Sequence, residues 1–307
     1  MELAGLRISI LGGDNRGIYA AAELAARGAD VLVYGLPLPP EAPAVKPCDD
    51  LRVAFNESDA LVIPLPGFDD EGRLPVLNGD APLVSKSLLA LIPSHVPVFS
   101  VFARPFLCRA AEQLNLRVIE LVNLDEFAIW NSIPSAEGAI QMAMDATPIT
   151  IHGSASWVLG FGRTGMTLAR MLAGIGAKVT VVARNPAARA RAEEMGYAAC
   201  SFETMRPAIS SADIIFNTVP ALVLDEDTLS ILKPAVHICD LASAPGGTDF
   251  GAAARLGIQA TLAPSLPGKV APKTAGQIMA RIIARLLLND APGIAKRGGA
   301  QHVVEGR

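Results

Sequence analysis

Three glycines in the stretch VLGFGRTGMTLARML follow the pattern Gly-x-Gly-x-x-Gly. An apolar run precedes the first glycine and a helical pattern follows the third. In such a strand–turn–helix unit the glycines permit a tight turn, close approach of a pyrophosphate and helix–strand packing, and free N–H groups at the helix start favour phosphates. The pattern predicts a dinucleotide site, with a purely structural turn as the alternative. The predicted contacts are Gly160, Phe161, Gly162, Arg163, Thr164 and Gly165.

The end of the next predicted strand, VVARNP, indicates which dinucleotide would bind. Sites for NAD usually carry an Asp or Glu there, which binds the ribose 2′-hydroxyl. This sequence has Arg184 and Asn185 instead. A guanidinium suits a 2′-phosphate, because it forms charge-assisted hydrogen bonds with it. We therefore expect NADP. Binding of NAD, and a solvated turn role for Arg184, are the alternatives.

Two further segments follow predicted strands with small or polar residues. NTVPA comes after DIIF, where such folds meet the nicotinamide ribose. CDLASAPGG ends the next strand with side chains small enough for a nicotinamide ring to lie close to the backbone. Ordinary strand–helix turns are the alternative for both. The residues predicted to contact the cofactor here are Thr218, Val219, Pro220, Leu241, Ala242 and Ser243.

A second glycine-rich turn, ILGGDNRG, lies near the start of the chain but lacks the Gly-x-Gly-x-x-Gly spacing. Asp14 would repel a pyrophosphate, so we do not expect a second dinucleotide there. Arg16 is a candidate to bind a substrate carboxylate instead, and a solvated surface role is the alternative. Other cationic candidates for this task are Lys86, Arg104 and Lys269.

The elements that carry these residues alternate between strands and helices in two series. The first begins with the strand RISILGG and the helix GIYAAAELAARG and contains about five strands; the second begins with SWVLGF. Such units join parallel strands through right-handed crossovers, and ligands bind beyond the carboxyl ends of the strands. We predict an α/β protein of two doubly wound, Rossmann-like parallel-sheet domains with an interdomain cleft.

The predicted domain limits follow from this alternation. They are an N-terminal substrate domain at 1–133, completed by an amphipathic helix at about 272–290, a linker helix at 134–147, an NADP-binding domain at 148–271 and a tail at 291–307. Ser135 is the expected N-cap of the linker helix, and Glu137 lies in its first turn, where the helix dipole favours a carboxylate. We expect the polar, glycine-rich tail to be disordered.

The composition argues against several classes of protein. The formal net charge is −4 over 307 residues, whereas nucleic-acid-binding domains usually present a strongly basic face. The most apolar helix candidate, IMARIIARLLL, is short and interrupted by two arginines, so no membrane span is predicted. The N-terminus lacks the basic region of a signal peptide, and the four cysteines show no CxxC spacing. We expect a cytoplasmic protein with reduced thiols and no metal site.

Four segments together resemble the A subunit of dipicolinate synthase from spore-forming Firmicutes: ILGGDNRG, IPSAEGAIQMAM, HGSASWVLGFGRTGMTLARML and LPGKVAPKTAG. The resemblance implies an architecture similar to D-2-hydroxyacid and alanine dehydrogenases. It implies NADP-dependent oxidation of dihydrodipicolinate, or of its hydrated precursor 4-hydroxy-tetrahydrodipicolinate, to dipicolinate. This would occur in the mother cell during sporulation, at a branch from lysine biosynthesis. The family acts with a flavoprotein-like B subunit, so a heteromeric complex is implied, and a homodimer stays open.

The sequence departs from the hydroxyacid dehydrogenases at two places. They carry an arginine after the strand that ends ICDLAS, and a catalytic histidine near the last strand. This chain has Ser-Ala-Pro at 243–245 and Leu-Pro-Gly-Lys at 266–269 instead. Oxidation of a lactate-like alcohol is therefore not expected. A dehydrogenase of another small carboxylate, and a non-catalytic nucleotide-binding protein that serves the B subunit, stay open as alternatives.

For a ring dicarboxylate, cationic side chains should bind the two carboxylates and fix the ring against the nicotinamide. Arg16 and Lys269 are the residues predicted to do so. Glu137 is the candidate proton acceptor, with a structural role at the helix start as the alternative. Asn131 and Ser135 are further candidates, because they lie near Glu137 where the linker helix is predicted to begin.

Overall fold

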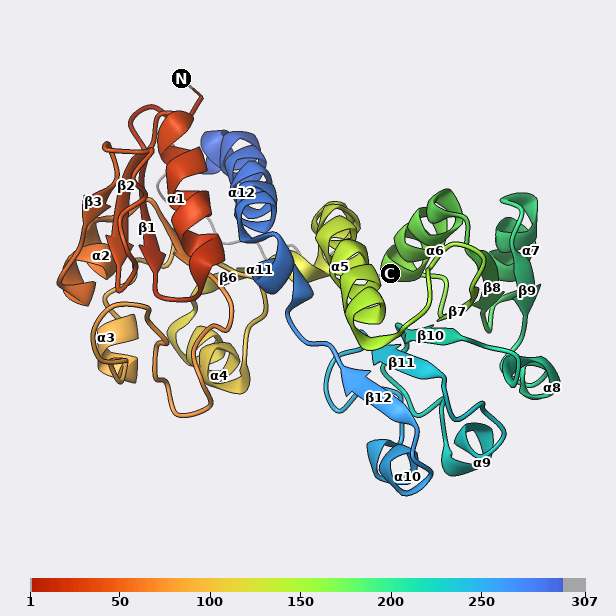
Figure 1. The fold of residues 1–307 in the computed structure, drawn as a ribbon. Helices are drawn as coiled ribbons and strands as arrows, with labels where there is room; N and C mark the ends of the chain where they lie inside the picture. Colours follow the sequence, from red (N-terminus) through yellow and green to blue (C-terminus); the bar gives the residue numbers. More distant parts are fainter. Residues whose placement is uncertain (1, 295–307) are drawn as a thin grey trace. The chain divides into compact units, whose positions relative to one another are not determined.

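The computed structural model describes residues 2–294, with side chains described up to residue 289, and divides into two compact units. Unit 1 contains the chain up to Phe127 together with the C-terminal helix α12 (Pro272–Ile294), and unit 2 contains Ala128–Ala271 (Figure 1). Each unit is built on a six-stranded sheet whose strands are all parallel. The predicted fold class, two doubly wound parallel sheets, is confirmed.

The sheet of unit 1 has the strand order β3-β2-β1-β4-β5-β6. Its strands are β1 (Arg7–Leu11), β2 (Asp30–Tyr34), β3 (Lys46–Pro47), β4 (Ala60–Ile63), β5 (Pro97–Ser100) and β6 (Arg117–Glu120). The prediction of about five strands was wrong by one. Strand β3 pairs with β2 inside a proline-rich stretch, and two residues are too few to show a strand pattern.

Helices cover both faces of this sheet. On one face, α1 (Asn15–Ala26) and α12 lie side by side and share a core with β1 and β2 (Figure 1). The helices on the other face are α2 (Leu51–Glu57), α3 (Lys86–Leu89) and α4 (Pro105–Leu114), and the 3₁₀ helix η1 (Leu121–Asn123) follows β6. A Cβ on Gly276 of α12 would lie 2.4 Å from the Arg16 carbonyl oxygen, so only glycine permits this close crossing of α1 and α12.

The sheet of unit 2 has the order β12-β11-β10-β7-β8-β9, which is the same arrangement of sequential strands as in unit 1. Its strands are β7 (Ala155–Leu159), β8 (Lys178–Val182), β9 (Ala198–Cys200), β10 (Ile214–Asn217), β11 (His237–Asp240) and β12 (Gln259–Leu262). Its helices include α6 (Arg163–Ile175), α7 (Pro186–Glu194), α8 (Arg206–Ile209), α9 (Glu226–Leu229), α10 (Phe250–Arg255) and α11 (Leu266–Val270). The order reverses between β7 and β10, so loops after these strands begin at the switch point of the sheet.

Helix α5 (Asp125–Ala146) corrects the predicted linker helix at 134–147. It begins nine residues before position 134, so Ser135 is not an N-cap and Glu137 is not in the first turn. Pro134 lies inside the helix, although proline usually breaks a helix interior because it lacks an N–H group. The hydroxyl of Ser132 donates to the Ile129 carbonyl at 2.6 Å, and that of Ser135 to the Asn131 carbonyl at 2.9 Å, which stabilises carbonyls around the proline.

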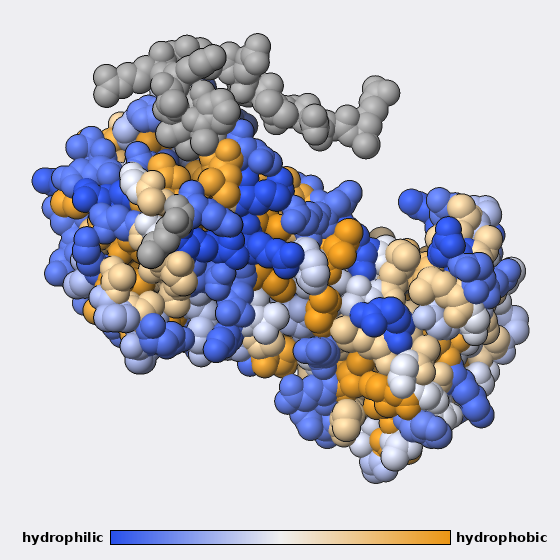
Figure 2. Space-filling model, turned by 90° about the horizontal axis from the view of Figure 1, so that it is seen from above, coloured by the Kyte–Doolittle hydropathy of each residue, from blue (hydrophilic) through white to orange (hydrophobic). Residues whose placement is uncertain are grey.

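The C-terminal region differs from the predicted tail in its first residues, because α12 extends to Ile294. The remaining part of that prediction, residues 295–307, lies outside the described residues. Among the described helices none is long and apolar enough to cross a membrane. On the face seen in Figure 2, hydrophilic and hydrophobic side chains are interspersed, which is ordinary for a protein surface.

Candidate functional site

The turn between β7 and α6 has the geometry that a dinucleotide site requires. Gly160 has a φ of 92°, and a Cβ there would lie 2.4 Å from Thr218 Oγ1. A Cβ on Gly165 would lie 2.1 Å from the Gly160 carbonyl oxygen, so glycine alone permits helix α6 to pack on the turn. A Cβ on Gly162, by contrast, would meet no atom within 4 Å. The space beside Gly162 is therefore open to a pyrophosphate.

Helix α6 begins with backbone donors that bind no acceptor among the described residues. Gly162 is the N-cap and has no side chain to accept from them. Within residues 2–294, the N–H groups of Phe161, Gly162 and Thr164 donate no hydrogen bond to the protein. These donors and the positive end of the helix dipole favour an anion at this place. The Phe161 side chain packs in the core, so only its backbone faces this site.

The loop after β8 presents a cation and no carboxylate. The Arg184 side chain is exposed and has no hydrogen-bond or ion-pair partner among the described residues. Arg189 of α7 fixes the backbone of this loop, because its Nη1 donates to the carbonyls of Ala183 and Arg184, each at 2.8 Å. Asn185 is the N-cap of α7 and accepts from the Ala187 N–H at 2.9 Å, so its carbonyl oxygen already has a structural role.

The loops after β10 and β11 lie at the same edge of the sheet as the glycine turn. Asn217, at the end of β10, is paired in register with Leu159 of β7 and with Asp240 of β11. The Thr218 hydroxyl donates to the Leu159 carbonyl at 2.9 Å. The structure thus brings together, at the carboxyl edge of one sheet, the predicted residues Thr218, Val219, Pro220, Leu241, Ala242 and Ser243 with Gly160–Gly165.

Two buried polar residues at this edge were missed by the sequence analysis. Asn217 and Asp240 are each 0% exposed and each ends a strand whose other residues are apolar or buried. The Asn217 Nδ2 donates to Asp240 Oδ1 at 3.0 Å. The signal that could have identified them is the polar residue that ends each of the two strands, IIFN and HICD.

The candidate catalytic residues of unit 2 lie on α5 and α11. Glu137 and Lys269 are exposed, and Asn131 and Ser135 are half-buried. The two helices pack together next to Glu137, because a Cβ on Gly138 would lie 3.1–3.2 Å from the side chains of Leu266 and Val270 of α11.

The same stretch of α5 also contacts helix α6, which follows the glycine turn. The Ser132 hydroxyl lies 2.7 Å from the hydroxyl of Thr167 on α6, one turn beyond the start of that helix. Asn131 and Ser135 flank Ser132 along α5. The structure therefore places Asn131, Ser135 and Glu137 on a helix that packs against both α6 and α11.

Arg16 has a partner within its own turn in unit 1. Its side chain is buried, with the residue 6% exposed, and its Nε donates to Asp14 Oδ1 at 2.9 Å and Oδ2 at 3.0 Å. Asp14 is also the N-cap of α1. A substrate carboxylate would have to replace Asp14 in this ion pair, so the predicted binding role of Arg16 stays a prediction with a competing structural role.

The first glycine turn itself is closed by other parts of unit 1. The N–H of Gly13 donates to the Pro75 carbonyl at 2.7 Å, and that of Asp14 to the Leu65 carbonyl at 3.0 Å. A Cβ on Gly12 would lie 2.2 Å from the same Pro75 oxygen. The chain therefore occupies the space that a pyrophosphate would need at this turn.

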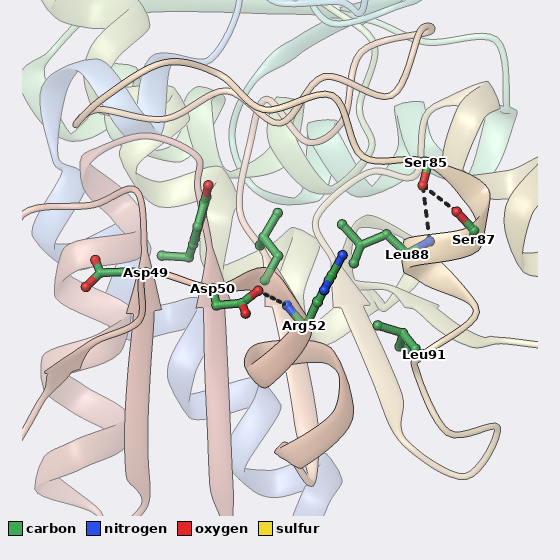
Figure 3. A pocket seen from close by; sticks show the side chains of 9 residues that line it. Asp49, Asp50, Arg52, Ser85, Ser87, Leu88 and Leu91 are labelled. Carbon is green, nitrogen blue, oxygen red and sulfur yellow. Dashed lines mark hydrogen bonds between the residues drawn. The ribbon is translucent and has the colours of Figure 1, made fainter.

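Unit 1 also contains a cavity of about 630 Å³ between the end of β2 and the starts of α2 and α3 (Figure 3). Asp50 accepts the Arg52 N–H at 2.8 Å and Ser85 accepts the Leu88 N–H at 3.2 Å, so these side chains begin helices. Burial, with the nearby carboxylates of Asp49 and Asp50, raises the pKa of Tyr34. The charged residues that line the cavity are two aspartates and one arginine, so the cavity does not suit a dicarboxylate.

Metal chemistry has no visible place in the described structure. Residues 2–294 contain no group of three or more His, Cys, Asp or Glu side chains that could hold a metal ion. Cysteines 48, 108, 200 and 239 are free thiols. Burial raises the pKa of Cys239 to about 12, so this thiol is unreactive at neutral pH.

A comparison with known proteins gives the family. The chain is 40% identical, over 93% of its length and 97% of the relative, to the dipicolinate synthase A subunit of Bacillus subtilis (strain 168). The chain belongs to the family of dipicolinate synthase A subunits. Residues 7–122 match the N-terminal domain of that family. The crystal structure of the A subunit from Bacillus halodurans superposes with a TM-score of 0.88 at 36% identity, covering 93% of this chain and 98% of that one.

More distant similarities identify the type of the second unit. Residues 132–244 match the NAD-binding domain of the D-isomer specific 2-hydroxyacid dehydrogenases, which indicates an oxidoreductase with a nicotinamide cofactor. An L-alanine dehydrogenase shares the fold, with a TM-score of 0.66 at 14% identity over 94% of this chain and 90% of that one. The open turn beside Gly162 and the unused donors of α6 fit such a cofactor.

Proposed function

We propose that this chain, the A subunit of a dipicolinate synthase, oxidises dihydrodipicolinate or 4-hydroxy-tetrahydrodipicolinate to dipicolinate with NADP. The observation that carries the proposal is the open glycine turn of unit 2, in a chain of this family, with Arg184 at the end of the neighbouring strand and without a side-chain partner among the described residues. The reaction would take place in the mother cell of a sporulating bacterium, together with the partner B subunit.

The cofactor preference rests on Arg184. Because no carboxylate follows β8, a ribose 2′-hydroxyl finds no acidic partner in this loop. The exposed guanidinium is free to bind a 2′-phosphate through charge-assisted hydrogen bonds. Arg189 fixes the loop backbone that carries Arg184, which limits the entropy lost when the phosphate binds. NAD remains the alternative cofactor.

The substrate residues follow from the chemistry of a ring dicarboxylate. Oxidation of the dihydro form removes one hydride and one proton, and the hydrated form must also lose water. When bound, the nicotinamide ring supplies the hydride acceptor. Lys269 would bind a substrate carboxylate, and Glu137 would accept the ring proton. Product aromaticity favours the reaction, so a carboxylate is a sufficient base.

Asn131 and Ser135 would orient the substrate through hydrogen bonds on the same helix as Glu137. Arg16 would contribute only if Asp14 released it, so the proposal does not depend on Arg16. An exchange of Lys269 for Met, which keeps the length of the side chain, should raise KM more than it lowers kcat.

The direct test is to follow dipicolinate absorbance with the purified chain, NADP and freshly prepared dihydrodipicolinate, with and without the partner protein. We expect dipicolinate and NADPH to form in equal amounts. Binding of NADP without any turnover, even with the partner present, would contradict the proposal.

A second candidate function is a non-catalytic protein that binds the nucleotide and serves the B subunit. It is favoured by the residues at 243–245 and 266–269, which lack the arginine and histidine of the hydroxyacid dehydrogenases. Turnover that needs only the partner's active site, and that survives Glu137→Gln and Lys269→Met in this chain, would support it. A dehydrogenase of another small carboxylate is the third candidate, and a panel of amino and hydroxy acids tests it.

A further inference from the structure

Asp240 is a completely buried carboxylate at the end of β11. It accepts four hydrogen bonds. The donors are Asn217 Nδ2 and the Ala242 N–H, each 3.0 Å from Oδ1, and the Gly247 N–H at 2.8 Å and Thr248 Oγ1 at 2.7 Å from Oδ2. Because all four partners donate, the ionised carboxylate satisfies them all.

These bonds join the loop after β10 to the loop after β11. The side chain of Asn217 also binds both the N–H and the carbonyl of Val219, each at 3.0 Å. The N–H groups of Val223 and Leu224 donate to the Gly247 carbonyl at 2.9 and 3.0 Å. We call residues 217–224 and 240–248 together the paired loops.

The paired loops leave little room for adjustment. A Cβ on Gly247 would lie 2.5 Å from three atoms at once: Asn217 Nδ2, the Val219 carbonyl oxygen and the Ala221 carbonyl oxygen. At Gly246, which has a φ of 88°, a Cβ would lie 3.0 Å from Asp240 Oδ2. A change at the carboxylate therefore cannot be absorbed locally, and it must shift the loops.

We infer that Asp240 is a positioning residue for the nicotinamide half of the cofactor. The inference rests on the proposed function, in which Thr218–Pro220 and Leu241–Ser243 contact that half. Asp240 touches no ligand itself, but it fixes both of these segments from behind. The adenine half depends on other elements, namely the glycine turn and Arg184, with which Asp240 forms no hydrogen bond in the described structure.

The test compares, by calorimetry, how tightly the full chain binds the whole cofactor and the adenine half alone. The probes are NADP and adenosine 2′,5′-bisphosphate, which contains only the adenine half. In Asp240→Asn, an amide donor replaces one acceptor oxygen and faces groups that also donate. We expect the Kd for NADP to rise about tenfold, and the Kd for the bisphosphate to change by less than about twofold.

A matched control is Asp213→Asn. Asp213 also holds loop backbone in unit 2, since it accepts the Ala155 N–H and binds Lys233, each at 2.8 Å. It lies at the opposite, amino-terminal edge of the sheet, so both dissociation constants should stay unchanged. Thr248→Val, which removes one donor to Asp240, is the milder variant and decides the matter if Asp240→Asn does not fold. It should weaken NADP binding a few-fold and spare the bisphosphate.

The outcomes separate this inference from the proposed function. Wild-type protein that binds neither NADP nor NAD would overturn both. If the wild type binds NAD alone, the cofactor preference is wrong, and the same comparison is made with NAD and AMP. If the dinucleotide binds, but the variants weaken it and its adenine half equally, or weaken neither, the positioning role of Asp240 is wrong.

Discussion

Units 1 and 2 have the same hydrogen bonds at the amino-terminal edge of the sheet and differ at its carboxyl-terminal edge. At the amino edge, the first strand of each unit donates its first N–H to an aspartate that precedes the neighbouring central strand. The pairs are Arg7 with Asp59 and Ala155 with Asp213, both at 2.8 Å. Both units therefore fix the register of the same two strands with the same device.

The difference lies in the turn after the first strand. In both units the first glycine of the turn donates to the end of the adjacent strand, Gly12 to Tyr34 and Gly160 to Val182. Beyond it, the N–H groups of Gly13 and Asp14 in unit 1 donate to carbonyls of the same unit, whereas the N–H of Gly162 in unit 2 has no acceptor among the described residues. From this difference we infer that a glycine-rich turn can bind an anion only where no other segment of the protein already accepts hydrogen bonds from its N–H groups.

The connection after the second central strand explains which turn is closed. In unit 1 the chain between β4 and β5 spans residues 64–96 and returns over the first turn, where Leu65 and Pro75 accept its amides. In unit 2 the corresponding connection, residues 218–236, is shorter, and its first part is hydrogen-bonded to the loop after β11. The length and course of one loop thus distinguish the closed turn of unit 1 from the turn that we propose binds the dinucleotide.

The largest expected effect comes from a methyl group on the binding turn. Gly165→Ala places a Cβ 2.1 Å from a backbone oxygen, so we expect it to abolish NADP binding and to lower the free energy of unfolding by about 2–4 kcal/mol. Gly162→Ala meets no protein atom and should leave stability unchanged, yet weaken NADP at least tenfold because the methyl group occupies the pyrophosphate space. Calorimetry measures both quantities.

The same change in unit 1 sharpens the comparison. Gly12→Ala brings a Cβ to 2.2 Å from the Pro75 oxygen and should destabilise the protein without altering NADP affinity. If Gly12→Ala weakened NADP as strongly as Gly162→Ala, the two turns would not differ in the way proposed.

Arg184→Asp should have the next largest effect. It replaces the cation at the end of β8 by a carboxylate, so NADP should bind about 100-fold more weakly, a loss of about 2.7 kcal/mol, while NAD gains a ribose partner. The control is Arg191→Asp, an equal charge change on the exposed face of α7, where Arg191 pairs with Glu194. Equal affinities of the two variants for NADP would remove Arg184 from the site.

Asp14→Asn tests the closed turn. It leaves the buried guanidinium of Arg16 without its counter-charge, so we expect the free energy of unfolding to fall by about 2–3 kcal/mol. The affinity for NADP should not change, because Asp14 belongs to unit 1. A variant as stable as the wild type, with altered substrate KM, would instead indicate that Arg16 serves the substrate.

The smallest expected effect concerns pH and unit 2. His237, at the start of β11, is 1% exposed, neither ring nitrogen has a hydrogen-bond partner in the described structure, and burial lowers its pKa. Its contribution to stability is therefore complete above the unfolded pKa of about 6.5 and is lost as the pH falls below it. The corresponding strand of unit 1, β5, starts with Pro97, which does not titrate.

Tryptophan fluorescence measures this effect, because Trp130 and Trp157 both lie in unit 2. Between pH 7 and pH 5 the wild type should lose about 1 kcal/mol more stability than His237→Leu. Parallel losses in the two proteins would show that other groups cause the acid sensitivity.

Much of the fold follows from the sequence, because buried parallel strands are continuous apolar runs and their helices are amphipathic. Two features did not follow. Strand β3 is too short to have a pattern, and α5 passes through Pro134, where local rules predict a helix end. In α5, the hydroxyls of Ser132 and Ser135 donate to backbone carbonyls one turn earlier, and the helix continues through the proline.

The candidate site also has some features that the sequence predicts and others that it does not. The glycine spacing and the missing acidic residue after β8 are local features, and the sequence contains them. The pairing of Arg16 with Asp14 and the network of Asp240 depend on which loops meet in space, which no spacing reveals. Cationic residues near strand ends could be named from the sequence, but their partners could not.

The central claim is that the turn of unit 2, and not that of unit 1, binds the dinucleotide. The most direct measurement is calorimetric titration of NADP into the full chain and into its Gly162→Ala and Gly12→Ala variants. The account predicts one molecule bound per chain, at an affinity that Gly12→Ala preserves and Gly162→Ala reduces at least tenfold. Two molecules per chain, or full affinity in Gly162→Ala, would contradict it.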